Sequence, residues 1–296
     1  MLDDHALPAA APISRRTGLA LVLHELAKAP LIAKLAIAII ATYLLVAIFA
    51  PVLAPYGEAE VVSPMPYAPW GGDFVFGTDQ LGRDMLSRLI YGARNSVGIA
   101  LATTLLSFCL GSVLGIMAAA LRGWVDQVFS RIVDVLMAIP QLVFALILLS
   151  IAGTSVLNLI LIIAVLDSTR VYRVARAVGM NVASMDFIEA AKLRGENVFW
   201  VVPREILPNI MPTLVAEFGL RFCFAFLTIS SLSFLGLGIQ PPTADWGSMV
   251  REASTLIAYG NISLFLPAGA IALLAIAVNV VVDLFLDKTS GLRDEK

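Results

Sequence analysis

Long runs of apolar residues, separated by shorter polar segments, dominate the chain. A helix needs about 20 apolar residues to cross the roughly 30 Å hydrocarbon layer of a bilayer. The long apolar stretch over residues 132–166 exceeds that need, and the turn-prone segment 152–155 divides it into two. The pattern predicts an all-α, polytopic membrane protein with six transmembrane helices, over about residues 31–53, 97–121, 132–152, 156–176, 212–235 and 264–286.

Lys and Arg residues fall mainly on one side of these spans. Six spans place both termini on the same side of the membrane, and short cytoplasmic loops accumulate Lys and Arg. With the N-terminus inside, all 20 Lys and Arg residues lie in cytoplasmic segments except Arg83, Arg88, Arg94, Arg221 and Arg251. We therefore predict cytoplasmic N- and C-termini, a cytoplasmic N-terminal segment over residues 1–30 and a transmembrane domain over residues 31–296.

The composition agrees with this class. Hydrophobic residues make up 59% of the 296 residues and charged residues 14%, against roughly 45–50% and about 25% in soluble domains. An ordinary cytosolic globule is excluded. The two cysteines, Cys109 and Cys223, lie in apolar runs without the neighbours of a metal site, and a net charge of −2 offers no basic field for nucleic acid. We expect no disulfide, no metal and no nucleic-acid partner.

A polar segment from about residue 167 to 211 lies on the predicted cytoplasmic side. Its part over residues 184–195 is typical of a short helix with Ser184 as N-cap and Gly195 as C-terminal cap. Small and apolar side chains on this helix would let a partner protein come close, which suggests a docking surface. A helix lying on the bilayer surface is the alternative.

Three arginines precede this helix, and few polar side chains fall inside the spans. Arg170, Arg173 and Arg176 are interpreted as positive-inside anchors. An ionisable residue at the centre of a span costs about 2.5–3.5 kcal/mol or more, so each one is a possible pathway residue. The candidates are Glu217, Arg221, Asn279 and Asp283.

For these candidates a structural role is the favoured interpretation. Glu217 and Arg221 lie four residues apart on one helix face and can neutralise each other. Asn279 is suited to hydrogen bonding between helices. Asp283 lies near the inner end of its span, where solvation lowers the cost of a charge.

Four motifs carry a resemblance to a known family. The chain resembles the dipeptide/oligopeptide/nickel permeases of ABC importers, specifically their C-type subunit. The motifs are Phe76–Asp84, Asp134–Pro140, the Glu189-Ala190-Ala191 triplet followed by Gly195 and Leu207-Pro208, and Ser233–Pro242. Their common order along most of the chain makes the resemblance specific.

The resemblance implies a role in coupling for the helix over residues 184–195. In that family the helix with the Glu-Ala-Ala motif seats in a groove of a cytoplasmic ATPase. This assigns ATPase coupling to Glu189, Ala190, Ala191, Gly195, Leu207 and Pro208. The chain departs from many similar peptide permeases in carrying Glu205 where they carry His, and it lacks their Trp near Asp167–Arg170.

The resemblance also implies the activity and the partners. We expect a non-catalytic translocation subunit of the inner membrane that moves di- or oligopeptides inward by alternating access. Its partners would be a second homologous permease, two ATPase subunits or domains, a periplasmic or extracellular solute-binding protein and membrane lipid. The sequence has no Gly-rich phosphate-binding motif, so ATP and Mg²⁺ are expected on the partner subunits and no cofactor on this chain. Nickel and opine- or glycoside-like solutes remain alternatives, as does a secondary transporter or channel subunit.

Overall fold

The computed structural model describes residues 30–257 and 262–289, so the predicted N-terminal segment 1–30 lies outside the described residues except for residue 30. Within the described part every regular element is helical, and the β pairings there are isolated bridges between residues 61 and 84. The elements are α2 (Leu31–Leu53), α3 (Met85–Gly92), the π-helical η1 (Ala93–Val97), α4 (Gly98–Leu121), α5 (Gly123–Met137), α6 (Gln141–Ala152), α7 (Val156–Ala183), α8 (Asp186–Leu193), α9 (Val198–Val201), the π-helical η2 (Val202–Ile206), α10 (Leu207–Phe234), α11 (Trp246–Ser254) and α12 (Phe265–Thr289).

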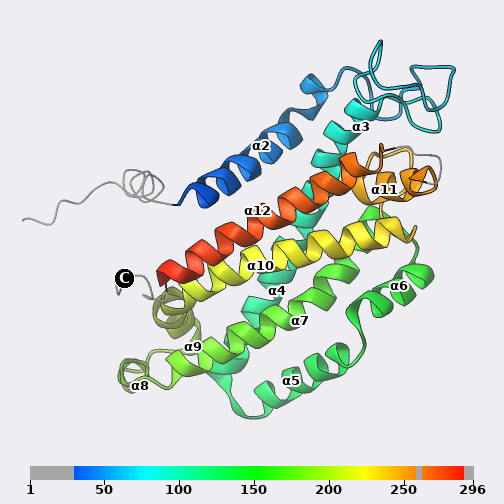
Figure 1. Ribbon diagram of the computed structural model, residues 1–296. Coiled ribbons are helices and arrows are strands. Elements are labelled where there is room, and N and C mark those ends of the chain that lie inside the picture. Colours follow the sequence, from blue (N-terminus) through cyan, green and yellow to red (C-terminus); the bar gives the residue numbers. More distant parts are fainter. Residues whose placement is uncertain (1–29, 258–261, 290–296) are drawn as a thin grey trace, which may run out of the picture.

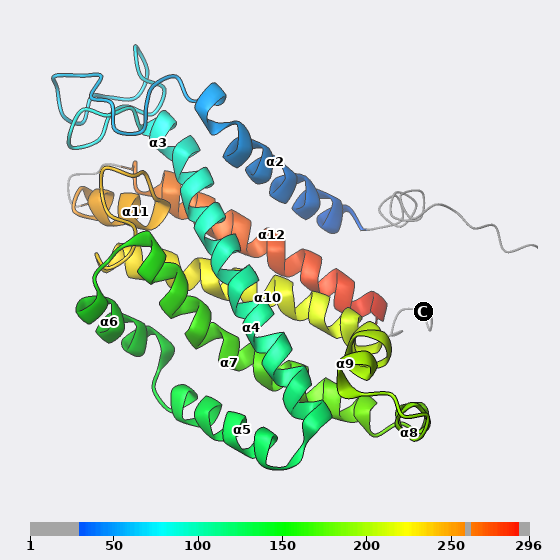
Figure 2. The ribbon, with the colours of Figure 1, turned by 180° about the vertical axis from the view of Figure 1, so that it is seen from behind.

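The long helices α4, α7, α10 and α12 form the centre of the molecule (Figure 1). α2 lies on the outside, next to α12, and the pair α5–α6 lies on the opposite edge, next to α7, in both views (Figures 1 and 2). The segment over residues 54–84 and α11 cap one end of the bundle. α8 and α9 lie at the other end, which is also where α2 begins and α12 ends.

Four described helical stretches are long and apolar enough to cross a membrane, and they are Leu31–Leu53, Met85–Leu121, Val198–Phe234 and Phe265–Asp287. The pair α5–α6 raises the number to five if it is counted as one span. α7, the predicted fourth span, is not among them, although it is 28 residues long. The all-α polytopic class is confirmed, whereas the total of six spans stays a prediction.

The predicted span over residues 132–152 is not a single continuous helix. α5 ends at Met137, α6 begins at Gln141, and their axes differ by 86°. Pro140 directly precedes α6, and its ring removes a backbone donor and disfavours helical geometry at the residue before it. The apolar run therefore cannot continue as one straight helix.

Two other spans begin earlier than predicted. α4 continues backwards through η1 into α3, and α10 continues backwards through η2 into α9, so these stretches begin at Met85 and Val198. Pro212, taken as the start of the predicted fifth span, lies inside α10. Proline is favoured in the first turn of a helix, and Pro208 occupies that place in α10.

Small residues hold α4 against α7, as expected of a packed helix. A Cβ atom added to Gly111 would lie 2.9 Å from the Tyr172 backbone nitrogen, and one added to Gly115 would lie 2.6 Å from the Tyr172 carbonyl oxygen. Such contacts require glycine, because the two backbones approach closely. Gly98, in the first turn of α4, has nothing within 4 Å of an added Cβ, so close packing does not require glycine there.

Candidate functional site

α8 protrudes from the end of the bundle that the sequence predicts to be cytoplasmic, between the end of α7 and the beginning of α10 (Figures 1 and 2), and we call this end the inner end. One side of it is fixed by apolar packing, because Ile188 and Ala191 are both 0% exposed. They belong to an apolar cluster drawn from α4, α7, α8, α9, η2 and α10. This inner apolar cluster consists of Ile116, Ala175, Val182, Ala183, Ile188, Ala191, Val201, Ile206, Ile210 and Leu214.

The other side of α8 is open. Glu189 and Ala190 are exposed, and Leu193 retains 84% of its accessible surface. Phe199, just after α8, is 78% exposed. The structure thus buries Ile188 and Ala191 and leaves Leu193 uncovered. The Glu-Ala-Ala triplet is thus split, with its first two residues outward and its third inward.

Gly195 ends α8, as predicted. It lies at φ +85°, a backbone conformation that glycine adopts readily. The Gly195 amide donates to the Lys192 carbonyl at 2.9 Å, and the Glu196 amide donates to the Ala191 carbonyl at 3.2 Å. These two bonds form a Schellman motif. A Cβ added to Gly195 meets nothing within 4 Å, so the backbone conformation rather than close packing calls for glycine.

The predicted N-cap of this helix is wrong. Ser184 is the C-cap of α7, and its hydroxyl donates to the Asn181 carbonyl at 2.8 Å. Met185 occupies the N-cap position without a side-chain bond, so α8 is two residues shorter at each end than the predicted helix over 184–195. The hydroxyl prefers the preceding helix because carbonyls at a helix end have no partner within the helix.

Leu207 and Pro208 lie at the first turn of α10. Leu207 packs on the inner apolar cluster, whereas Pro208 is exposed. Glu205, the departure from the family pattern, is half-buried in η2, and its backbone carbonyl accepts a bond from Asn209 at 2.6 Å. Of the predicted coupling residues, the structure thus joins Ala191 and Leu207 in one cluster and leaves Glu189, Ala190, Gly195 and Pro208 on the surface.

Glu217 and Arg221 pair as predicted, with 2.8 Å between Oε1 and Nε. Asp167 joins them from α7, with its Oδ1 3.6 Å from Nη1 of Arg221. The sequence analysis missed Asp167 because it took this residue as the start of the polar segment over residues 167–211. The helix spacing offered a signal, since Asp167 follows the start of α7 at Val156 by about 17 Å, close to half the hydrocarbon layer.

Asn279 confirms the predicted bond between helices. Its Nδ2 lies 3.0 Å from the Ala275 carbonyl within α12 and 3.3 Å from the sulfur of Cys223 in α10. The contact with Cys223 ties α12 to α10. Asp283 is exposed on α12. Neither residue belongs to the ion-paired cluster of Asp167, Glu217 and Arg221, and a pathway role for Asn279 and Asp283 stays a prediction.

The three arginines of α7 have different environments. Arg176 makes a bidentate pair with Asp126 of α5, and its Nη2 lies 2.6 Å from Oδ2. Arg173 pairs with Asp134 of α5 at 2.8 Å. Arg170 turns toward α10 instead, where its guanidinium lies 5.9 Å from the centre of the Phe224 ring. Positive-inside anchoring therefore describes only part of their role, since two of them attach α5 to α7.

At the opposite end, three buried charged residues and the half-buried Glu252 tie the segment over 54–84 and α3 to α11. Nε of Arg83 lies 2.6 Å and Nε of Arg88 lies 3.3 Å from the same Asp79 oxygen. Nη2 of each arginine lies within 3.7 Å of Glu252 Oε2. We call these four residues the outer clamp. Burial raises the pKa of the Glu252 carboxyl, against the opposing effect of the two arginines.

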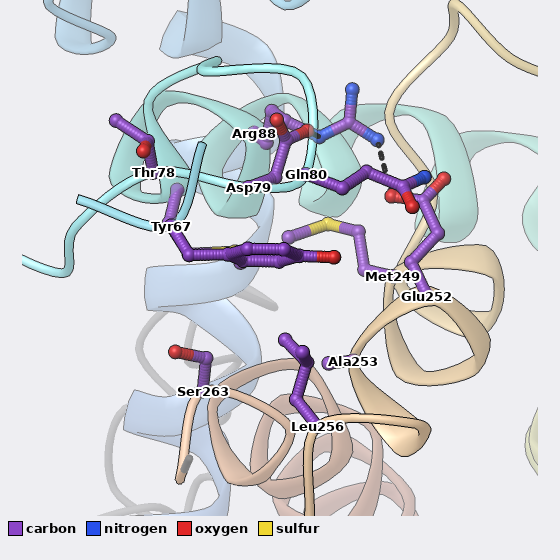
Figure 3. Close-up of a pocket in the computed structure, with 11 residues that line it drawn as sticks. Tyr67, Thr78, Asp79, Gln80, Arg88, Met249, Glu252, Ala253, Leu256 and Ser263 are labelled. Atoms are coloured by element: carbon purple, nitrogen blue, oxygen red, sulfur yellow. Dashed lines mark ion pairs between the residues drawn. The ribbon is translucent and has the colours of Figure 1, made fainter. Parts of the chain in front are cut away.

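The outer clamp borders a small pocket. Figure 3 shows the Tyr67 ring between Asp79 and Gln80 on one side and Leu256 on the other. The free space is little larger than one water molecule, which excludes a peptide. Asp84 is the N-cap of α3 and accepts a bond from the Ser87 amide at 2.7 Å. The motif Phe76–Asp84 thus ends in the residue that caps α3.

Comparison with known proteins agrees with this architecture. The family model described as "Binding-protein-dependent transport system inner membrane component" matches residues 111–290. A di/tripeptide transport system permease protein of Pseudomonas aeruginosa is 35% identical over 254 residues, which cover 84% of this chain and 82% of the relative. A dipeptide transport system permease protein of Haemophilus influenzae is 33% identical, covering 84% of each chain.

A third relative carries a different solute name. The glutathione transport system permease protein of Pectobacterium atrosepticum is 34% identical over 219 residues, which cover 74% of this chain and 70% of the relative. The region matched by the family model includes α7 to α10. The chain is a multi-pass membrane protein that belongs to the binding-protein-dependent inner membrane component family, as a C-type permease of the dipeptide/oligopeptide ABC group.

Proposed function

We propose that the chain is a permease subunit of an ATP-driven importer of di- or oligopeptides. The relatives named for di/tripeptide, dipeptide and glutathione transport support a peptide-like solute over nickel or an opine- or glycoside-like one. A second homologous permease completes the path, and a solute-binding protein delivers the peptide from outside. Two ATPase subunits or domains bind ATP and Mg²⁺, and this chain itself is not an enzyme.

The attachment of α8 carries this proposal. Glu189 and Ala190 face outward, while Ile188 and Ala191 are fully buried in a cluster that includes residues of both α7 and α10. An ATPase that holds the outer face of α8 can therefore move two long helices together. Each nucleotide state of the ATPase must favour one permease conformation, because a partner with equal affinity for both would shift nothing. Alternating access follows from that preference.

The placement of the ends supports the predicted orientation. α8, the beginning of α2 and the end of α12 lie at the same end of the bundle (Figures 1 and 2). If α8 meets a cytoplasmic ATPase, the described chain enters and leaves the membrane on the cytoplasmic side of the inner membrane.

The test replaces Gly195 with tryptophan in the full complex, reconstituted in proteoliposomes with its solute-binding protein. We expect uptake of dialanine per ATP hydrolysed to fall at least tenfold, because a bulky side chain at the end of α8 disturbs the ATPase contact. Gly123→Trp is the matched control, since Gly123, the first residue of α5, also lies at positive φ (+62°) in open space. It should keep normal uptake per ATP.

Equal losses in both variants, or normal uptake in Gly195→Trp, would contradict the coupling role of α8. Uptake by the wild-type complex that needs an ion gradient and no ATP would instead support a secondary transporter.

A further inference from the structure

Three charged side chains are buried about halfway along α7 and α10. Asp167 is 0% exposed, and Glu217 and Arg221 are each 8% exposed. We call them the central triad. Two carboxylates against one guanidinium leave a surplus of one formal negative charge. Both oxygens of Asp167 lack a hydrogen-bond partner in the described structure. The triad is thus neither neutral nor fully satisfied by this chain.

Arg170 supplies the balancing positive charge at the edge of the triad. Its guanidinium and that of Arg221 both lie near the Phe224 ring, at 5.9 Å and 4.8 Å from its centre. Cations are attracted to the face of an aromatic ring, so Phe224 holds both groups in place. Arg170 is half-buried and Phe224 is 47% exposed, so this pair borders the open surface of the chain.

Arg170 differs from the other two arginines of α7. Arg173 and Arg176 each pair with an aspartate of α5, whereas no salt bridge of Arg170 within 4.0 Å occurs among the described residues. Its guanidinium therefore keeps donors for a further group. A planar guanidinium binds a carboxylate through two parallel hydrogen bonds, which makes an incoming carboxylate the matching ligand.

The position of Arg170 along α7 favours a polar environment over lipid. It follows the start of α7 at Val156 by about 21 Å, which lies inside the roughly 30 Å hydrocarbon layer if α7 spans the membrane. Charged residues at such depth face a partner helix or a water-filled path. The surface of α7 and α10 around Phe224 is therefore the part of this chain suited to border the path of the solute.

We propose, resting on the proposed function, that Arg170 binds the C-terminal carboxylate of a zwitterionic peptide in transit, next to the central triad. A dipeptide carries one negative and one positive end. Its carboxylate complements Arg170, and its ammonium end complements the surplus negative charge of Asp167, Glu217 and Arg221. The site as a whole then stays neutral when it is occupied, which avoids a net charge inside the membrane.

The test measures binding rather than transport. The membrane complex of both permeases and the ATPases is placed in nanodiscs without the solute-binding protein, whose own preference would interfere. Equilibrium dialysis then compares L-alanyl-L-alanine with its C-terminal amide, without nucleotide and with a non-hydrolysable ATP analogue. We expect the wild-type complex to bind the free acid at least tenfold more tightly than the amide in at least one state.

Arg170→Gln should weaken binding of the free acid at least tenfold and remove the preference over the amide. Arg170→Lys should keep part of the preference, because it keeps the charge. Arg173→Gln is the matched control, three residues away in the same helix, and it should keep the preference in full. No measurable dipeptide binding by the wild-type complex, equal binding of acid and amide, or an unchanged preference in Arg170→Gln would each overturn the inference.

Failure of the proposed function gives a different result. In that case the wild-type complex shows no ATP-dependent uptake of dialanine. The binding assay measures the acid-over-amide preference and its dependence on Arg170 separately from uptake.

Discussion

The two ends of the bundle are held together by opposite means. At the outer end, buried charges and capped turns attach the segment over 54–84 to α3 and α11, and the partners lie within this chain. At the inner end, α8 is attached by apolar packing alone on one side and exposes its other side. Polar bonds fix direction and distance, whereas apolar packing tolerates small sliding. The outer end is thus held rigidly within the chain, whereas the inner end leaves one face of α8 exposed, the face that our proposal assigns to the ATPase.

The largest expected effect comes from breaking the outer clamp. Arg88→Met leaves Asp79 and Glu252 buried with less compensation, because Arg88 is 1% exposed and lies near both. Breaking a buried charge pair costs about 3–5 kcal/mol. We expect a clear fall in the midpoint of thermal unfolding of the detergent-solubilised protein. Arg94→Met, at an exposed arginine of the next helical turn, is the control and should leave the midpoint nearly unchanged.

A second prediction concerns the packing of α8 on the inner apolar cluster. Ile188→Ala removes a fully buried side chain from the inner apolar cluster and should destabilise the packing of α8 by about 2–5 kcal/mol. Amide hydrogen exchange should rise in α8 and α9 and stay unchanged in α11, because the two ends are held separately. Leu193→Ala, at an 84% exposed residue of the same helix, should leave the exchange of α8 unaltered. Faster exchange at both ends in Ile188→Ala would show that they are one cooperative unit.

These two regions also differ in how far the sequence predicts them. The inner end is largely predictable from the sequence. α8, its glycine cap and the apolar spans beside it depend on local signals, such as Gly195 and the length of the apolar runs. The sequence does not predict which face of α8 is buried. Ile188 and Leu193 are similar apolar residues, and only the position of α7 and α10 buries one of them. Ser184 fails for a similar reason, because two helix ends compete for one hydroxyl.

The partners of the charged residues are even harder to predict from the sequence than the faces of α8. Asp167 looks like the boundary of a polar segment, yet α10 brings Arg221 to it from 54 positions further along the chain. Arg173 and Arg176 depend on α5, whose position follows from the break at Pro140 inside an apolar run. Such pairings are set by tertiary contacts between distant segments, and run length and residue spacing carry no record of them.

The smallest expected effect is a pH dependence confined to the outer end. Burial raises the pKa of Glu252 and of Asp245, the N-cap of α11, so both carboxyls bind their proton more tightly in the folded protein than in the unfolded chain. Their contribution to stability is therefore largest at acidic pH and declines as the pH rises through the raised values. Glu252→Gln should flatten the fall of the unfolding midpoint as the pH rises above the ordinary range of a glutamate carboxyl. A steeper profile in Glu252→Gln would mean that the charged form of Glu252, paired with its arginines, stabilises the outer end more than burial opposes it.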